Sequence, residues 1–380
     1  MIRLTIPTIA EDDLQAVHEV LASGYLVQGP HVAAFERAVA EYVGCQYAVA
    51  VSNGTAALHL ALLALDVRPG DIVLVTAYSW LSTANVIELC GAQPVFVDVQ
   101  PDTFNISPAC LEEALQRLMA VSATAQRVKA ILPVHTFGQM ADMPAILELA
   151  NRYTVPVVED AACALGATWH GRQAGTWGVM GCFSFHPRKA ITTGEGGMIT
   201  TEDAALARRL RALRNHGLDP NALTPDFIMP GFNYRLTEFQ AALGLTQMSK
   251  LERLITSRRR QAAHYDTLLA STPIQAPIVN TNGASVYQSY VVLLPEHSTT
   301  YRQNLVRQLK ERNIETTIGT WHMPMTTYFR QRYGYKTGEF PVTDRVFARA
   351  MALPLYEGLS AQDQQHICTT MCDVLEELVK

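Results

Sequence analysis

A lysine that follows an apolar run is the first residue in this sequence whose setting could support covalent chemistry. The run 182–185 is followed by a turn at 186–188, then by Lys189 and a glycine-rich stretch at 194–197. A lysine presented from a tight loop at the end of a sheet can form a Schiff base with an aldehyde once it has lost its proton. Burial and a neighbouring cation favour that loss, and Arg188 is adjacent. Taken alone, the motif is explained more simply as a surface lysine in a glycine-rich loop.

A second apolar run ends in two carboxylates, Glu159 and Asp160, which two alanines follow. Ligands of open α/β sheets bind beyond the C-terminal ends of the strands, so a carboxylate there is well placed to contact a ligand. An aspartate can pair with a protonated pyridine nitrogen and keep the ring electron-withdrawing. The structural alternative is that Asp160 caps the N-terminus of a following helix.

A third motif could hold a phosphate group. The tetrapeptide 52–55 lies between an expected strand and an expected helix. Its Gly54 lets the backbone approach a phosphate closely, and the helix N-terminus supplies free N–H groups. Thr55 and Ser184 could add hydroxyl donors. The alternative is an ordinary serine or asparagine cap for the helix.

Trp80 comes just after the expected strand 72–75 and could stack on a planar heteroaromatic ring. The alternative is a core tryptophan packed under a loop.

Each of these four motifs is weak by itself. Together they supply a Schiff-base lysine, a counter-ion for a pyridine ring, a phosphate cradle and a stacking surface. Pyridoxal 5'-phosphate (PLP) requires all four.

These residues must be positioned by a sheet. Short apolar runs alternate with helical patterns up to about residue 203, which is typical of a doubly wound α/β domain whose strands are buried on both faces. The expected strands are 47–51, 72–75, 94–97, 129–133 and 155–158, and the expected helices are 12–22, 30–42, 56–65 and 85–90.

Beyond residue 214 the pattern changes to a polar loop and then to one long helical stretch over 237–269. A strand at 290–294 and helices at 301–312 and 361–379 follow. We therefore expect a large PLP-binding domain over residues 1–250, with an N-terminal helical segment, and a small C-terminal α+β domain over residues 251–380.

Composition excludes several other classes of function. The formal net charge of the 380-residue chain is −5, so it has no general attraction for nucleic acid or an anionic membrane. The seven cysteines include no C-x-x-C pair, and no metal site is expected. The start of the chain lacks the pattern of a signal peptide, and no apolar stretch is long enough to cross a bilayer, so we expect a cytoplasmic protein.

The chain resembles the DegT/DnrJ/StrS-type sugar aminotransferases, a branch of the fold-type I PLP enzymes, nearly from end to end. The motifs that carry the resemblance are 24–30 (GYLVQGP), 52–58 (SNGTAAL), 70–71 (GD), 94–99 (PVFVDV), 158–162 (VEDAA), 184–197, 231–238 (GFNYRLTE) and 353–356 (LPLY). The resemblance implies a mostly parallel seven-stranded sheet between helices. It also implies PLP as the cofactor.

The resemblance also implies roles for individual residues. Lys189 would carry PLP as a Schiff base, and Asp160 would face the pyridine nitrogen, which makes these two the expected catalytic residues. The other expected cofactor contacts are the ring-stacking Trp80, the residue at position Cys163, Asn233, and the phosphate ligands Gly54, Thr55, Ala56 and Ser184.

The resembling proteins act as homodimers that share their active sites. By this resemblance, Asn233 would reach the partner's cofactor phosphate, and Arg235 would lie beside it, near the substrate. The expected acceptor pocket contains Tyr25, His186, His216, Arg235, Trp321 and His322. For the tyrosine, the tryptophan and the histidines of this set, a structural hydrogen bond is about as good an explanation as a substrate contact.

One position departs from the family pattern. Three residues after the aspartate the family usually has histidine or glutamine, and here the residue is Cys163. A thiol is a weak hydrogen-bond donor, so the usual contact is lost, passes to water or is supplied by another residue.

The reaction implied is the transfer of an amino group from L-glutamate or L-glutamine to a keto sugar. The expected acceptor is a nucleotide-linked 4-keto or 3-keto deoxyhexose. The alternatives are a keto-cyclitol of the scyllo-inosose type, a PLP lyase or dehydratase on the same fold, and a PLP-binding regulatory protein. Some family members with histidine in place of the lysine are dehydratases, and Lys189 argues against that activity here.

Overall fold

The computed structural model describes residues 1–296 and 301–379. At its centre, seven strands lie in the order β1-β10-β9-β6-β5-β2-β4, because two parallel bridges, Ile131 to Val157 and Val134 to Asp160, join the two hydrogen-bonded groups. β10 runs antiparallel to both neighbours, and the other pairs are parallel. The strands are β1 (Tyr47–Val51), β2 (Ile72–Thr76), β4 (Gln93–Val97), β5 (Val128–Leu132), β6 (Val158–Asp160), β9 (Met180–Ser184) and β10 (Gly197–Thr201). The mostly parallel seven-stranded sheet is confirmed.

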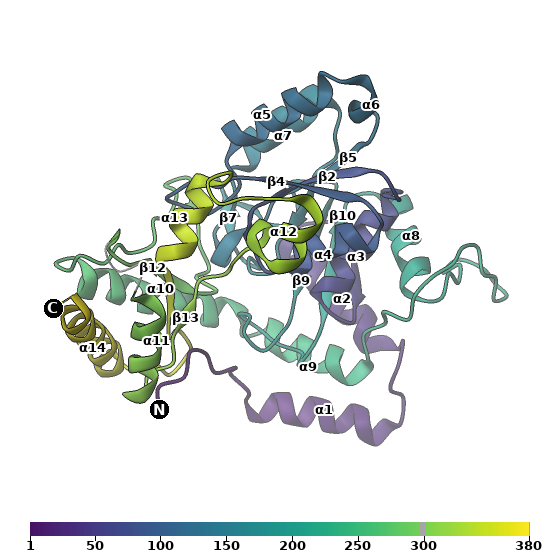
Figure 1. Ribbon diagram of the computed structural model, residues 1–380. Helices are drawn as coiled ribbons and strands as arrows, with labels where there is room; N and C mark the ends of the chain where they lie inside the picture. Colours follow the sequence, from purple (N-terminus) through teal and green to yellow (C-terminus); the bar gives the residue numbers. More distant parts are fainter. Residues whose placement is uncertain (297–300, 380) are drawn as a thin grey trace.

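Helices cover both faces of this sheet (Figure 1). Successive strand residues face opposite layers: in β1, Ala48 and Ala50 pack into one core, and Val49 and Val51 pack into the other. Burial on both faces is the reason for the unbroken apolar runs in the sequence. The first core includes α2 (Pro30–Val43), α5 (Pro108–Met119) and α7 (Met143–Tyr153); the second includes α3 (Gly54–Ala64), α4 (Ser82–Leu89) and α8 (Ala204–Arg214).

The long helical stretch expected over 237–269 is helical but is broken in two. The stretch forms α9 (Glu238–Met248), which lies along α1 (Glu11–Ser23), and then α10 (Leu251–Leu269). The break falls at Ser249 and Lys250. The ammonium of Lys250 lies 2.7 Å from a carboxylate oxygen of Asp12 and 2.7 Å from one of Asp13 on α1. These long-range ion pairs hold the chain where the helix axis changes, and they leave no local sequence signal.

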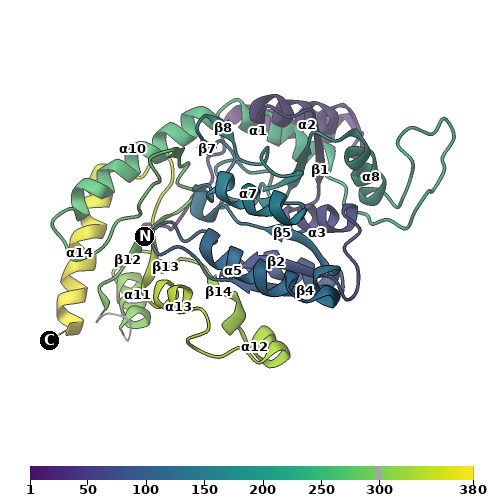
Figure 2. The same cartoon turned by 90° about the horizontal axis from the view of Figure 1, so that it is seen from above.

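A second, smaller sheet lies at the C-terminal end of the chain. Its strands β12 (Tyr290–Leu293), β15 (Ala350–Leu353) and β13 (Thr317–Ile318) are antiparallel, and they pack with α11 (Arg302–Glu311) and α14 (Ala361–Val379). The long helix α10 reaches from one sheet to the other (Figure 2). Its Leu254 packs into the large core and its Tyr265 into the small one. A domain boundary at residue 250 therefore stays a prediction.

Part of the C-terminal half packs on the large sheet instead. β14 (Trp321–His322) pairs with β3 (Tyr78–Ser79). Phe329 of α12 (Thr327–Tyr333) and Phe340, the residue before α13 (Pro341–Arg349), enter the second core. The short elements are α6 (Ser122–Ala125), β7 (Thr168–Trp169), β8 (Arg172–Gln173), β11 (Gly283–Ala284), η1 (Thr136–Gly138) and η3 (Met323–Met325). In the described part of the chain, no helix has the length and apolar character needed to span a bilayer.

Candidate active site

Asp160 is the last residue of β6 and has only 4% of its surface exposed. Its Oδ2 accepts a hydrogen bond from Thr83 Oγ1 at 2.7 Å, and its Oδ1 accepts one from the N–H of Ala162 at 3.1 Å. Burial raises the pKa of Asp160, although these two hydrogen bonds and the nearby charge of Lys189 act in the opposite direction. A turn, not a helix, follows Asp160, so the helix-cap alternative is excluded.

Lys189 lies on the turn that follows β9, the strand next to β6. The turn is closed by a 2.8 Å hydrogen bond from the Lys189 N–H to the His186 carbonyl. The side chain is half-buried, and its Nζ donates to Cys163 Sγ at 3.0 Å. It is therefore not a freely solvated surface lysine. Since the parallel strands β6 and β9 end at the same edge of the sheet, Asp160 and Lys189 face the same space.

The turn before α3 comes unusually close to the end of β9. A Cβ atom on Gly54 would lie 2.8 Å from the Cβ of Ser184 and 3.2 Å from its Oγ. A Cβ on Gly197 would lie 2.4 Å from the carbonyl oxygen of Asn53. Only glycine fits at either position without a backbone shift, and the result is a small concave surface formed by a helix N-terminus and a serine hydroxyl.

The free donors in this turn differ from the expected set. Asn53 Oδ1 accepts the Ala56 N–H at 2.8 Å, so Ala56 is engaged as part of the helix cap and its N–H is removed from the predicted phosphate ligands. In the part of the chain that the structure describes, the N–H groups of Gly54 and Thr55 have no protein partner. They remain candidates with the Ser184 hydroxyl. The helix cap and the phosphate site are thus compatible.

Trp80 directly follows β3 and is 62% exposed, so it is not a core tryptophan. It is three residues from Thr83, the residue that binds Asp160. A planar cation with a phosphate group fits these residues: a buried carboxylate, an exposed indole, a half-buried lysine and a cradle that a Cβ would fill. PLP has this combination of groups.

The predicted acceptor residues form two groups. Tyr25 and His216 are exposed, and Arg235 donates to Asn215 Oδ1 at 2.7 Å. The segments that carry them are side by side, because Val27 forms a bridge with Thr237. Asn233 is exposed nearby, and the carbonyl of the next residue, Tyr234, accepts the N–H of Ser52 in the phosphate turn at 2.8 Å.

The second group lies on the Lys189 and Trp80 side. His186 is half-buried, and burial lowers its pKa. Trp321 is partly exposed and pairs with Ser79 through β14. His322 is only 3% exposed and binds Asp344 at 3.0 Å through Nε2, so it serves as a structural hydrogen-bonding residue and not as part of an open pocket. The prediction for His322 is corrected accordingly.

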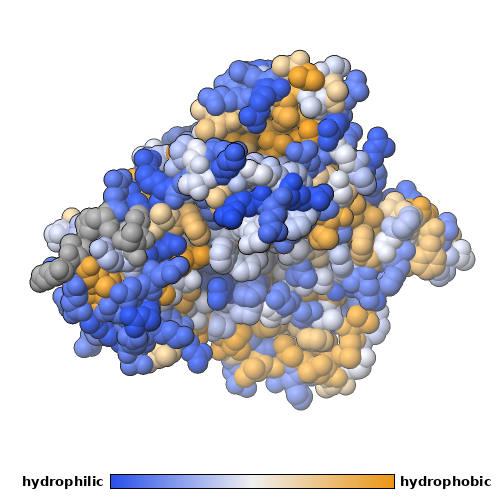
Figure 3. All heavy atoms as spheres, viewed as in Figure 1, coloured by the Kyte–Doolittle hydropathy of each residue, from blue (hydrophilic) through white to orange (hydrophobic). Residues whose placement is uncertain are grey.

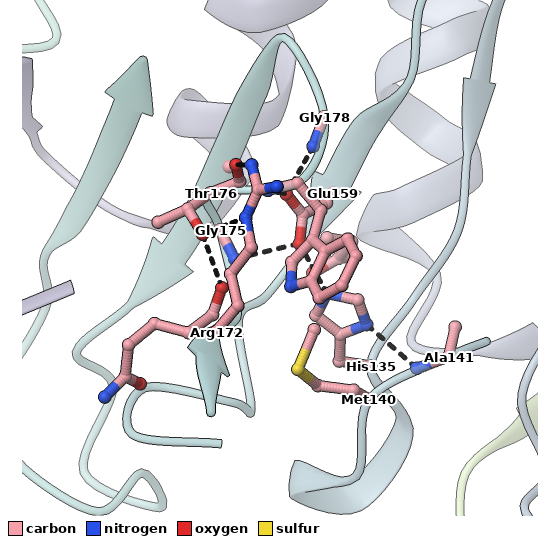
Figure 4. Close-up of polar contacts among 12 residues, drawn as sticks. His135, Met140, Ala141, Glu159, Arg172, Gly175, Thr176 and Gly178 are labelled. Carbon is pink, nitrogen blue, oxygen red and sulfur yellow. Dashed lines mark hydrogen bonds and ion pairs between the residues drawn. The ribbon is translucent and has the colours of Figure 1, made fainter. Parts of the chain in front are cut away.

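The sequence motifs assigned no role to Glu159, although the alternation of side chains along a strand predicts its direction. Because adjacent strand residues point in opposite directions, Glu159 must point away from Asp160. Its buried carboxylate accepts hydrogen bonds from the N–H groups of Gly175, Trp177 and Gly178 at 2.9, 2.6 and 2.7 Å. His135 Nε2 lies 2.8 Å from the same carboxylate, and His135 Nδ1 accepts the Ala141 N–H, so the ring donates through Nε2 (Figure 4).

Known proteins are similar to this chain over most of its length. The model of the DegT/DnrJ/EryC1/StrS aminotransferase family matches residues 7–372. The chain is 39% identical to the GDP-perosamine synthase of Caulobacter vibrioides over 91% of both chains. It is 36% identical to the spore coat polysaccharide biosynthesis protein SpsC of Bacillus subtilis over 98% of this chain and 96% of SpsC.

Solved structures are similar over the whole length. A protein of Streptococcus pneumoniae, assigned as a sugar aminotransferase, is 26% identical with full coverage of both chains, and the TM-score is 0.93 for its PMP form and 0.92 for its PLP form. Helicobacter pylori PseC, an aminotransferase of pseudoaminic acid biosynthesis, is 25% identical with a TM-score of 0.91 over 99% of both chains.

Proposed function

The chain belongs to the DegT/DnrJ/EryC1/StrS aminotransferase family, and from this premise we propose that it transfers an amino group from L-glutamate or L-glutamine to a nucleotide-linked keto deoxyhexose. That it is a PLP-dependent sugar aminotransferase follows from the family and its relatives. The identities of the donor and the acceptor are the proposal. The cytoplasmic location expected from the sequence also stays a prediction.

The acceptor class is supported by the relative with 39% identity, which is named for a GDP-linked amino sugar. The amino group would be added at the carbonyl carbon of a 4-keto or 3-keto group on the hexose. Exposed Tyr25 and His216, with half-buried Arg235, offer hydrogen-bonding groups that suit a polyhydroxylated substrate. A keto-cyclitol offers similar hydroxyl groups and is the alternative acceptor to be tested.

The observation that carries the proposal is that buried Asp160 and half-buried Lys189 lie at the ends of adjacent strands, next to the Gly54 cradle. PLP, when bound, supplies the electron sink for breaking a C–H bond beside nitrogen. Asp160 would keep the ring nitrogen protonated. Lys189 would bind the cofactor and, once released, would carry the proton between the substrate carbon and the cofactor.

We also propose a homodimer with shared sites. Exposed apolar side chains lie on α1, including Leu14 and Leu21, and on the loop after α8, including Leu223 and Phe227. Figure 3 shows apolar surface over α1 and on that protruding loop. Such patches on a folded chain mark interaction surfaces. Asn233 forms a bridge with Asn215, which directly follows α8 at the start of that loop, so a partner seated on the loop would bring Asn233 close to a second cofactor site.

The test is spectroscopic. Purified protein reconstituted with PLP should show the visible absorption band of a lysine-bound cofactor and lose it on addition of L-glutamate or L-glutamine. Lys189→Ala should lack the band, whereas Lys336→Ala, at an exposed lysine, should keep it. Protein loaded with pyridoxamine phosphate should regain the band with a nucleotide-linked keto hexose and not with scyllo-inosose. A band that no amino donor changes would contradict the proposed function.

A further inference from the structure

Three buried polar side chains form a chain that ends on Asp160. Ser79 Oγ lies 3.1 Å from Thr83 Oγ1, and Thr83 Oγ1 lies 2.7 Å from Asp160 Oδ2. The exposed fractions of Ser79, Thr83 and Asp160 are 5%, 0% and 4%. Thr83 belongs to the first turn of α4, whereas Asp160 ends β6, so the contact spans 77 positions of sequence.

The direction of these hydrogen bonds depends on the charge of Asp160. An ionised carboxylate only accepts, so the single hydroxyl proton of Thr83 must point at Asp160. Thr83 Oγ1 then has only lone pairs for Ser79, which must donate in turn. A hydroxyl that donates to a buried carboxylate stabilises the charged form, and it also fixes the rotamer of the side chain.

No other side chain hydrogen-bonds Asp160 among the described residues, since its other partner is the Ala162 backbone N–H. The ionisable groups that act on Asp160 or lie beside it are Lys189, His135, Glu159 and Cys182. Of these, His135 and Glu159 are already hydrogen-bonded to each other. Among the residues that the structure describes, Thr83 is therefore the one side-chain donor that orients the carboxylate directly.

We propose that Thr83 is a positioning residue of this aminotransferase, whose hydroxyl holds Asp160 ionised and aimed at the pyridine nitrogen of PLP. The proposal rests on the role proposed above for Asp160. Thr83 touches neither cofactor nor substrate in this role. Ser79 supports it by donating to Thr83.

The chain also connects the cofactor side to the acceptor side. Ser79 is paired in register with Trp321 of β14, and Tyr78 is paired with His322. The backbone that carries Ser79 is thus held by the same short strand that carries a candidate acceptor residue.

The experiment measures the dissociation constant of PLP for the apoprotein by equilibrium dialysis, with the visible band as a second readout. Thr83→Val keeps the shape of the side chain and removes the donor. It should weaken PLP binding by about tenfold, the size of one hydrogen bond to a charged group. Thr83→Ser should restore binding to within about twofold. Ser82→Ala removes a neighbouring hydroxyl on the same helical turn and should change nothing.

The Asp160→Ala background, which removes the group that Thr83 contacts, shows whether Thr83 acts through Asp160. There, Thr83→Val should cause no further loss, because an interaction between two residues disappears when either is removed. Equal losses in both backgrounds, or a Thr83→Val protein with wild-type affinity and spectrum, would overturn the proposal without affecting the proposed function. If Thr83→Val does not fold, Ser79→Ala decides by the same cycle. Wild-type protein that binds PLP but transfers no amine would instead contradict the proposed function.

Discussion

An ionised carboxylate that is buried without a bound cation destabilises a folded protein, and Asp160 is such a carboxylate in the cofactor-free chain. Burial outweighs its two hydrogen bonds and the charge of Lys189, so its pKa is raised. The unfolded chain therefore loses the proton at a lower pH than the folded chain does. Between these two pKa values and above them, ionisation of Asp160 lowers the stability of the cofactor-free protein. The same carboxylate binds a protonated pyridine ring more strongly because little water competes for it.

Asp160→Asn should consequently stabilise the apoprotein at pH 8 and weaken PLP binding. The amide can keep both contacts, because Thr83 can accept from it and donate to Ser79 instead. The gain should shrink as the pH falls to about 3, below the ordinary aspartate pKa of about 3.9, because Asp160 of the wild type is then mostly neutral in both states. Urea unfolding of the two apoproteins at both pH values checks this. A variant that is less stable than the wild type at pH 8 would contradict it.

At the residue scale, the sequence predicted the kinds of groups but not all of their contacts. Lys189, Asp160 and Trp80 were recognisable because each follows an apolar strand. The departure at Cys163 was visible too, but its 3.0 Å contact with Lys189 Nζ was not. Thr83 was missed because nothing local distinguishes a hydroxyl that contacts a strand 77 positions away.

At the element scale, the site exists because parallel strands β6 and β9 end together and the glycines let α3 approach them. Strand positions were predictable from apolar runs, since both faces are buried. The break between α9 and α10 was not, because it depends on contacts of Lys250 with α1. Likewise, the return of β14 to the large sheet depends on a pairing with β3 that no local pattern encodes.

Glu159 tests how strongly the end of β6 is held. Glu159→Gln replaces a carboxylate that accepts four hydrogen bonds by an amide with one acceptor oxygen, whose NH₂ group must face N–H donors. We expect the free energy of unfolding to fall by about 2–4 kcal/mol. Glu202→Gln, at an exposed position, should change it by less than about 0.5 kcal/mol. Equal stability of the two variants in urea would show that the network is unimportant.

Gly54 tests the phosphate cradle. Gly54→Ala places a Cβ 2.8 Å from the Ser184 Cβ, which is fixed to the backbone, so the turn must shift. PLP affinity should fall at least about tenfold, as for the loss of one charged hydrogen bond. The double variant Gly54→Ala with Ser184→Gly removes the clash and should recover thermal stability. It should not recover affinity, because the hydroxyl is gone. Calorimetry and dialysis separate these effects, and a Gly54→Ala protein with wild-type affinity would exclude the cradle.

At the scale of the whole molecule, the predicted site residues lie in two groups on one chain. The cofactor group includes Asp160, Lys189 and Trp80, and the other includes Tyr25, Asn233 and Arg235. The family resemblance predicted that Asn233 serves the partner's cofactor. Intramolecular patterns cannot reveal such sharing, because the interface appears in a single chain only as exposed apolar side chains on α1 and on the loop after α8. In a symmetric dimer with an isologous interface, the cofactor group of each subunit would meet the second group of its partner, which gives two equivalent sites.

Hybrid dimers test this sharing directly. Lys189→Ala and Asn233→Ala homodimers should each be inactive or strongly impaired, since every site lacks one group. In a mixed dimer, one site carries both substitutions and the other carries neither. After denaturation together in equal amounts and refolding, random pairing should restore about a quarter of wild-type activity. The Asn233→Ala protein refolded with wild-type protein serves as the control for recovery. Mixtures no more active than the average of the two parents would show that Asn233 acts within its own subunit.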